Sequence, residues 1–295
     1  MTDAVLGTIP AAVTDEIESP ARRAFRRLLK RKGAVAGLVV IAAFVLLALF
    51  APLVMPFDPI ATSWSAVRKA PSAQHWFGTD DLGRDIFARV IYGARASLMA
   101  GAISVAIALS IGVPLGLLSG YRGGFIDALI SRITDAMLAC PFLILAIALA
   151  AFLGPSLGNA MIAIGISATP IFIRLTRGQV MSVKVEDYIE AARAMGNPRW
   201  RIALFHILPN IMPALLVQAT LAIAAAIIAE AALSFLGLGQ QPPAPSWGSM
   251  LNSAQRFLTS APWMALWPGF AIFLVVLSFN LVGDGLRDAL DPRER

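Results

Sequence analysis

Three carboxylates, those of Asp80, Asp81 and Asp85, lie within six consecutive residues and have the chemistry to hold a cation. Calcium requires about six to eight oxygen ligands, and the basic side chain of Arg84 stands inside the same stretch. These four residues therefore suit loop capping and ion pairing, or contact with another protein, better than metal binding. We predict no metal site in this chain.

Histidine and cysteine are too few for the common catalytic sites. The two histidines, His75 and His206, are far apart in the sequence, and the single Cys140 lies in an apolar run, as is typical of a small buried side chain. The sequence also has no Gly-x-x-x-x-Gly-Lys-Ser/Thr phosphate loop. We therefore predict a non-catalytic chain that does not itself hydrolyse ATP and binds no cofactor.

The composition is that of a polytopic membrane protein. Hydrophobic residues make up 58% of the 295 residues and charged residues only 14%, whereas a soluble domain has about 25% charged residues. Six apolar runs are long enough to cross about 30 Å of hydrocarbon. They cover residues 34–54, 98–118, 137–153, 157–175, 211–236 and 265–282.

The basic residues are distributed unevenly between the two sides of the predicted membrane. Of the 24 Lys and Arg, 18 fall in the two termini and in the loops after the second and fourth runs, and 6 fall in the other two long loops. The positive-inside rule therefore predicts that both termini and the loop after the fourth run are cytoplasmic. This sorting also explains the net charge of +6 without nucleic-acid binding, and we predict no nucleic-acid partner.

These runs divide the chain into three parts. Residues 1–33 form a cytoplasmic segment, an acidic leader predicted to be disordered and then a basic stretch beside the membrane. Residues 34–283 form the six-helix domain, with external loops at 55–96 and 237–264 and a cytoplasmic loop at 176–210. Residues 284–295 form a cytoplasmic tail.

One acid, Glu230, lies well inside the fifth apolar run. A charge at that depth is costly and usually faces a cavity or another helix. Three interpretations stay open: the side chain lines a substrate path, it makes a hydrogen bond between helices, or it lies near the outer interface.

Glycines and prolines mark packing and bends in the runs. Gly112, Gly116 and Gly120 recur every fourth residue, which predicts close packing of the second run against a neighbouring helix. Pro114 and Pro141 predict kinks in the second and third runs.

The long cytoplasmic loop has the signals of a helix–turn–helix. Acids precede the helix-forming residues 190–195, and Gly196-Asn197-Pro198 ends that helix and starts a second, basic and apolar one. By physical chemistry alone, this loop either enters a groove of another protein or lies on the membrane surface. The two alternatives remain equally open.

The same loop resembles the coupling loop of ABC importer permeases, in which Glu-Ala-Ala is followed by Gly and later by Leu-Pro. A histidine stands where Ile is usual, and His-Ile-Leu-Pro-Asn is similar to the peptide-permease version. Segments 77–98, 233–248 and 279–292 resemble the second permease subunit of dipeptide, oligopeptide, glutathione and nickel importers. The matching loop residues are Glu190, Ala191, Ala192, Gly196, Leu208 and Pro209.

The resemblance implies an all-α polytopic membrane protein with six transmembrane helices, the type I ABC importer permease fold, in the bacterial cytoplasmic (inner) membrane. It implies a second homologous permease, two cytoplasmic ATPases that hold ATP and Mg, and an external substrate-binding protein. Short peptides are the first expected cargo, then glutathione, then a nickel chelate. Asp80, Asp81, Arg84 and Asp85 become candidates for contact with the binding protein.

A rival of another class is an ATP-independent secondary transporter or channel. Such a protein would typically show internal repeats or more charge inside the membrane, and neither is evident here.

Overall fold

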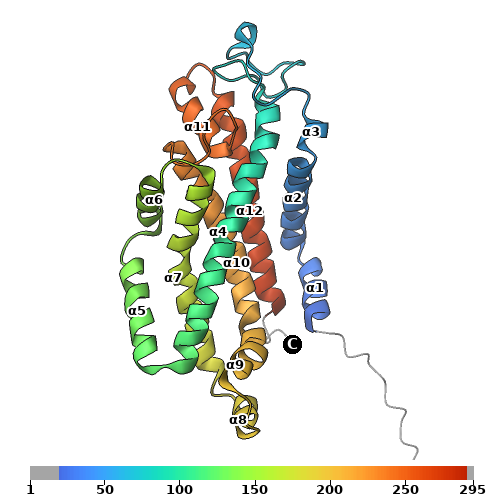
Figure 1. Ribbon diagram of the computed structural model, residues 1–295. Coiled ribbons are helices and arrows are strands. Elements are labelled where there is room, and N and C mark those ends of the chain that lie inside the picture. Colours follow the sequence, from blue (N-terminus) through green and yellow to red (C-terminus); the bar gives the residue numbers. More distant parts are fainter. Residues whose placement is uncertain (1–19, 291–295) are drawn as a thin grey trace, which may run out of the picture.

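The computed structural model describes residues 20–290, and this part of the chain is helical, with a single isolated β-bridge between Thr79 and Asp85. Residues 1–19, which the sequence predicts to be disordered, lie outside the described residues. So do residues 291–295 of the predicted tail. The helices shown in Figure 1 are α1 (Pro20–Lys30), α2 (Lys32–Leu49), α3 (Ala51–Val54), η1 (Trp64–Ala66), α4 (Ile86–Arg122), α5 (Gly124–Leu138), α6 (Phe142–Leu153), α7 (Leu157–Val183), α8 (Asp187–Ala194), α9 (Arg199–Ile202), η2 (Ala203–Ile207), α10 (Leu208–Phe235), α11 (Trp247–Ala254), η3 (Gln255–Phe257) and α12 (Trp263–Leu290).

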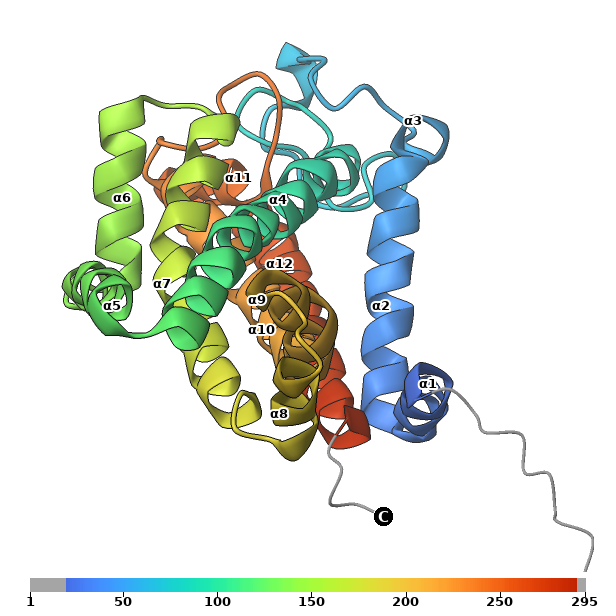
Figure 2. The same ribbon diagram turned by 60° about the horizontal axis from the view of Figure 1, so that its bottom comes forward.

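Five helical segments of the described chain are long and apolar enough to cross a membrane, and a bent pair of helices makes a sixth if it counts as one span. The five contain α2, α4, α7, α10 and α12. They run side by side, with α5 and α6 on one flank and α2 on the opposite flank in both ribbon views (Figures 1 and 2). This confirms the all-α, six-segment architecture.

The third apolar run, predicted over residues 137–153 with a kink at Pro141, is divided between two helices. It begins inside α5, and α6 then turns away from α5 by 90°. Pro141 is the N-cap of α6, and its ring fixes φ and removes a hydrogen-bond donor, so α5 cannot continue through it. The 12 residues of α6 span only about 18 Å. The predicted bend at Pro141 is confirmed, and it divides the run into two helices instead of kinking one.

Two helices extend beyond the apolar runs that marked them. The 37-residue α4 starts at Ile86 and is about 55 Å long, so residues 86–96 are helical although the sequence placed them in a loop. It passes Pro114 as one helix. Likewise, α7 continues to Val183 and takes in the first residues of the predicted loop 176–210. The predicted boundaries were too short because a charged residue interrupts the apolar pattern but does not end a helix.

The glycine stripe brings α4 close to α7, as predicted. A Cβ atom on Gly112 would lie 2.6 Å from Cβ of Phe172, and one on Gly116 would lie 2.5 Å from Cβ of Thr176. Gly120 likewise faces α7 at its lower end. A side chain at any of these positions would separate the helices, so the stripe fixes their distance.

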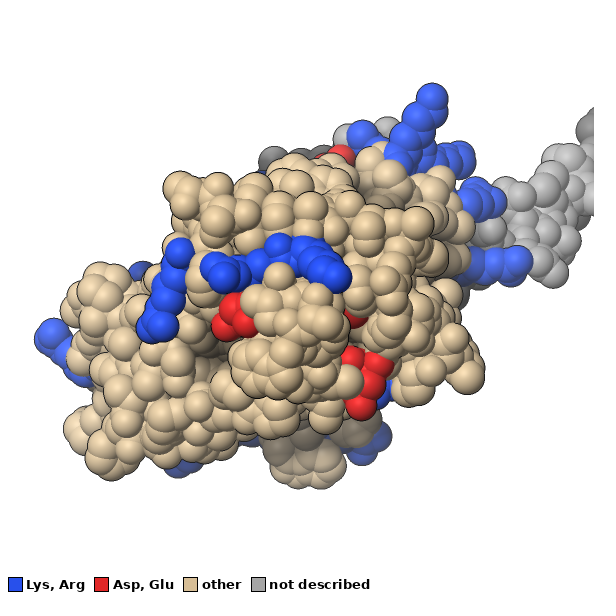
Figure 3. Space-filling view, turned by 90° about the horizontal axis from the view of Figure 1, so that it is seen from above, with Lys and Arg blue, Asp and Glu red and all other residues tan. Residues whose placement is uncertain are grey.

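The two ends of the bundle carry different structures. The segment between α3 and α4 lies with α11 at one end, and α8 and α9 form the other (Figure 1). The space-filling view in Figure 3 shows a mostly uncharged surface on which basic side chains are gathered in a few groups. Two of the candidate sites, the segment before α4 and the helices α8 and α9, lie at these two ends (Figure 1).

Candidate functional site

The helix–turn–helix predicted from the sequence is present as α8, a turn and α9, here called the hairpin (residues 187–202). Gly196 has φ +78°, a left-handed conformation that glycine adopts without strain. The backbone N–H groups of Gly196 and Asn197 donate to the carbonyls of Arg193 (2.9 Å) and Ala192 (3.2 Å). The Asn197 side-chain amide also donates to Ala192 O (3.1 Å). These bonds satisfy the last carbonyls of α8 and set the reversal of the chain.

One face of the hairpin is packed into the bundle. Ile189, Ala192 and Ile202 have almost no exposed surface, and they join a buried cluster with Val180 of α7 and Ile211 of α10. This burial anchors the hairpin to two long helices at once.

The opposite face is open and largely apolar. Glu190 and Ala191 are exposed, and the side chains of Met195, Trp200 and Phe205 are 75%, 62% and 66% exposed. Phe205 belongs to the adjoining η2 turn and lies beside Trp200. Exposed apolar side chains of this size are common on surfaces that bind a partner or a membrane. The arrangement is a rigid, small-residue helix presented on an anchored base.

Polar contacts fasten the base of the hairpin to α4. Lys184 Nζ donates to the carbonyl of Gly120 (2.9 Å), and the guanidinium of Arg193 lies 5.8 Å from the centre of the Tyr121 ring. Arg193 also donates to the carbonyl of Lys184 (3.3 Å). The base of the hairpin is therefore linked directly to the last turn of α4.

The six residues of the loop motif do not share one environment. Glu190, Ala191, Gly196 and Pro209 are exposed, Leu208 is half-buried and Ala192 is buried. Only the exposed members are available to a partner, whereas Ala192 is small because α8 packs tightly there. The motif thus combines contact residues with packing residues.

His206 lies in η2, a π-helical turn that joins α9 to α10. The carbonyl of His206 accepts a hydrogen bond from Asn210 Nδ2 (2.6 Å). The ring Nδ1 of His206 is buried with no partner among the described residues. His206 and His75 lie at opposite ends of the bundle, because one is in the α9–α10 junction and the other precedes α4. The separation of the two histidines predicted from the sequence is confirmed.

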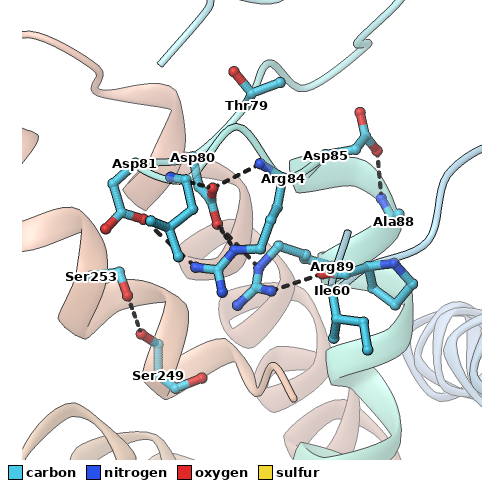
Figure 4. A network of polar contacts seen from close by, with 12 residues as sticks. Ile60, Thr79, Asp80, Asp81, Arg84, Asp85, Ala88, Arg89, Ser249 and Ser253 are labelled. Carbon is cyan, nitrogen blue, oxygen red and sulfur yellow. Dashed lines mark hydrogen bonds and ion pairs between the residues drawn. The ribbon is translucent and has the colours of Figure 1, made fainter. Parts of the chain in front are cut away.

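At the other end, Asp80 organises the turn that leads into α4 (Figure 4). Its Oδ1 accepts the backbone N–H groups of Leu82 and Arg84 (both 2.9 Å). Its Oδ2 accepts Arg84 Nε (2.6 Å) and lies 3.5 Å from Arg89 Nε. Arg89 also donates to the carbonyl of Pro59 (2.8 Å). Asp80, Arg84 and Arg89 are each at most 7% exposed, so this network is internal.

Asp85 and Asp81 have separate tasks in the same turn. Asp85 caps α4 by accepting the Ala88 N–H (2.8 Å), and its other oxygen lies 2.9 Å from His75 Nδ1. Asp81 is the partly exposed member, 3.6 Å from Arg84 Nη2. Partial burial and the neighbouring charge of Asp80 raise the pKa of the Asp81 carboxyl above its ordinary value.

These positions bear on the prediction of a binding-protein contact. Asp80, Arg84 and Asp85 are buried, and their groups are used in capping and ion pairing. Asp81 alone of the four presents appreciable surface. Loop capping and ion pairing, the first alternative drawn from the sequence, account for the cluster, and a contact through Asp81 stays a prediction.

Glu230 has no exposed surface. Its two carboxyl oxygens accept hydrogen bonds from Ser97 Oγ of α4 (3.0 Å) and Ser234 Oγ of α10 (2.7 Å). Ser97 Oγ also accepts the N–H of Trp247 at the start of α11 (3.4 Å). The structure shows the hydrogen bond between helices, and the carboxyl is buried within this chain. A role in lining the substrate path stays a prediction.

Sequence reasoning missed the partners of these groups. Ser97 lies 133 residues from Glu230, and Arg177 of α7 makes two hydrogen bonds to Asp127 of α5 across 50 residues (2.6 and 2.7 Å). Serine and isolated charges carry no spacing signal of their own. Only the juxtaposition of helices reveals these pairs.

Comparisons with known proteins agree with this architecture. Residues 112–295 match the model of the "Binding-protein-dependent transport system inner membrane component", and residues 19–71 match the "N-terminal TM domain of oligopeptide transport permease C". The chain is 55% identical to the dipeptide transport system permease protein DppC of Alkalihalophilus pseudofirmus, over 93% of this chain and 90% of that protein. It is 44% identical to the glutathione transport system permease protein GsiD of Pectobacterium atrosepticum, over 98% of this chain and 97% of that protein.

The fold is also found among solved structures. An inward-facing structure of the MetNI methionine ABC transporter superposes with a TM-score of 0.58 at 22% identity, over 70% of this chain and 98% of that chain. A second crystal form gives 0.55 at 23% identity, over 68% and 96%. The shared fold is that of a type I ABC importer permease. With a family model over most of its length and relatives at this identity, the chain belongs to the inner-membrane permease components of binding-protein-dependent ABC transport systems.

Proposed function

We propose that this chain forms half of the translocation path of an ATP-driven importer of short peptides, and that its hairpin docks on an ATPase subunit. The observation that carries the proposal is the hairpin itself. Its inner face is anchored in the α4–α7–α10 bundle, whereas Glu190, Ala191 and Met195 are free on the outer face. A small, rigid, exposed helix fits the groove of another protein, and family membership favours this over a membrane-surface helix.

Energy for transport comes from other chains in this proposal. This sequence has no phosphate loop, so two ATPase subunits bind ATP and Mg. The hairpin and both termini then face the cytoplasm, which agrees with the excess of Lys and Arg on that side. A second, homologous permease completes the path in the bacterial inner membrane, and an external binding protein delivers the cargo.

The cargo follows from the relatives. The 55% identity is to a protein named for dipeptide transport, and the 44% identity is to one named for glutathione transport. Glutathione is itself a tripeptide, so both point to a short, zwitterionic, peptide-like molecule. We place dipeptides first and glutathione second.

The test uses the complete transporter in proteoliposomes with its binding protein. Gly196→Pro forces the φ of +78° to about −65° and so destroys the reversal between α8 and α9. Glu190→Lys with Ala191→Arg changes the exposed face and leaves the buried face intact. Both variants are expected to lower substrate-stimulated ATP hydrolysis and uptake by about tenfold or more, since losing a central contact costs about 2 kcal/mol.

Asp284→Lys is the matched control, because it reverses an exposed charge at the end of α12, outside the hairpin. It is expected to leave coupling unchanged. If the hairpin variants insert normally and retain full stimulated ATPase activity and uptake, the docking role is wrong.

A further inference from the structure

A large cavity lies beside the hairpin, between the last turns of α4 and the α9–α10 junction. Its volume is about 1100 Å³, far more than a few ordered waters occupy. We call it the basal groove. It is lined by Val113, Pro114, Leu117, Leu118, Tyr121, Arg122, Arg193, Asn197, Arg199, Trp200, Ile202, Ala203, Leu204 and Leu208.

The groove is polarised along its length. On the α4 side, its wall runs from Val113 and Leu117 to Tyr121 and Arg122, nine residues or about 13 Å. The deep end is aliphatic, and the outer end is cationic and aromatic. Tyr and Trp side chains of this kind are typical of the membrane interface.

Three arginines gather at the outer end, Arg122 from α4, Arg193 from α8 and Arg199 from α9. None of the groove's described lining residues is acidic, and none of these arginines forms an ion pair within residues 20–290. Arg193 contacts only a carbonyl and a tyrosine ring. The lining of the groove thus carries three guanidinium groups and no carboxylate among its described residues.

We propose that the basal groove binds an anionic phospholipid of the membrane leaflet that adjoins the hairpin. Its acyl chain would lie along Val113, Leu117 and Leu208, and its phosphate would be held by Arg122 and Arg199. Guanidinium groups suit this role because their planar fork matches phosphate oxygens. The aliphatic-to-cationic gradient, running along a membrane helix, matches the polarity of one lipid molecule better than that of a zwitterionic peptide.

Such a lipid would join two parts of the protein. Arg122 belongs to the long helix α4, and Arg193 and Arg199 belong to the hairpin. A phosphate shared between them adds a link to the one made by Lys184 and Gly120. The lipid would therefore stiffen the hairpin against α4. The proposal requires only that α4 enters the membrane and is independent of ATPase docking.

The test uses Trp200, which lines the groove and is 62% exposed, as a contact probe. The complete transporter is placed in nanodiscs containing increasing fractions of phosphatidylglycerol or phosphatidylcholine with brominated chains, which quench tryptophan on contact. The Trp200→Phe variant supplies the background from the other five tryptophans of this chain and from those of the partner chains. Trp200 is expected to be quenched at a much lower fraction of phosphatidylglycerol than of phosphatidylcholine.

A charge-matched pair of double variants then localises the site. Arg122→Gln with Arg199→Gln removes two groove arginines, whereas Arg132→Gln with Arg201→Gln removes two exposed arginines outside it. Each basic residue near a membrane surface contributes about fivefold to anionic-lipid affinity. The first pair should therefore raise the half-quenching fraction by about 25-fold, and the second pair should leave it nearly unchanged.

Three results would overturn the proposal. Equal quenching by the two lipids in the unsubstituted protein removes the anionic preference, and this comparison needs no variant to fold. If the two double variants change the half-quenching fraction equally, the lipid does not bind at the groove arginines. Absence of quenching by either lipid in the assembled transporter means that the second permease, or the transport path, occupies the groove.

Discussion

Replacing Gly116 by alanine is the sharpest test of the packing between α4 and α7. The new methyl carbon would lie 2.5 Å from Cβ of Thr176 and 2.8 Å from the carbonyl oxygen of Ile173. Carbon atoms prefer a separation of about 3.5–4.0 Å, so the two helices must part by about 1 Å. Neither neighbour can rotate away, since one is a Cβ atom and the other is backbone.

The energetic cost can be isolated with a second glycine. Overpacking of this kind costs about 1–3 kcal/mol, whereas Gly→Ala inside a helix gains up to about 1 kcal/mol. Gly178 of α7 is also helical, and a Cβ there meets no atom within 4 Å in the described part of the chain. Both variants receive the helix-forming gain, so their difference reports the overpacking alone.

We expect Gly116→Ala to be about 1–3 kcal/mol less stable than Gly178→Ala. For a chain of this size that difference lowers the melting temperature by about 2–10 °C. The assay is thermal unfolding of the purified protein in one detergent, followed by tryptophan emission and by loss of the monodisperse peak. If the two variants melt together, α4 and α7 are not held at the distance described.

Three further predictions concern the polar groups. Glu230→Leu should destabilise the protein by about 1–3 kcal/mol, because it leaves two buried serine hydroxyls without their acceptor, and Glu230→Gln should cost less; equal melting of the two would contradict the hydrogen-bonding role. A double-mutant cycle on Asp127 and Arg177 should give a coupling energy of about 1 kcal/mol in thermal or denaturant unfolding, and additive single variants would refute the pair. The raised pKa of Asp81 means that the folded state binds its proton more tightly than the unfolded state. The protonated Asp81 carboxyl therefore stabilises the folded state below its ordinary pKa of 3.8. This stabilisation is lost as the pH rises through the pKa of Asp81 in the folded protein. Stability relative to Asp81→Asn should therefore fall as pH rises through the acid range, and a pH-independent difference in melting temperature would exclude the shift.

Short-range signals in the sequence predicted the local elements well. The four-residue spacing of Gly112, Gly116 and Gly120 predicted a close helix contact, because it places the glycines on one face of α4. Gly196 predicted the reversal between α8 and α9, since it supplies the left-handed turn. Both features depend on a few neighbouring residues, which is the range over which one sequence carries direct information.

Longer-range features were less accessible. The distant partners of two acids were not predicted: Ser97 contacts Glu230, and Arg89 contacts Asp80 from the start of a helix that the apolar pattern placed in a loop. The bend at Pro141 was predicted, but its angle of 90° was not, because the apolar composition of residues 137–153 is the same for a slight and a sharp bend. Hydropathy shows which segments avoid water. The position of each segment in the bundle depends on contacts with residues that are distant in the sequence.

The helix α4 joins the two ends of the molecule. At its end near α8, Gly120 receives Lys184 from the base of the hairpin; at its opposite half, Ser97 meets Glu230 of α10 and the N–H of Trp247. α4 is also packed closely against α7 along the glycine stripe, so the hairpin is joined to two long helices that contact each other. The contacts at Gly120 and at Ser97 lie about 35 Å apart on one continuous helix, and under the proposed function α4 is the path by which an ATPase docked on the hairpin would act on the start of α11.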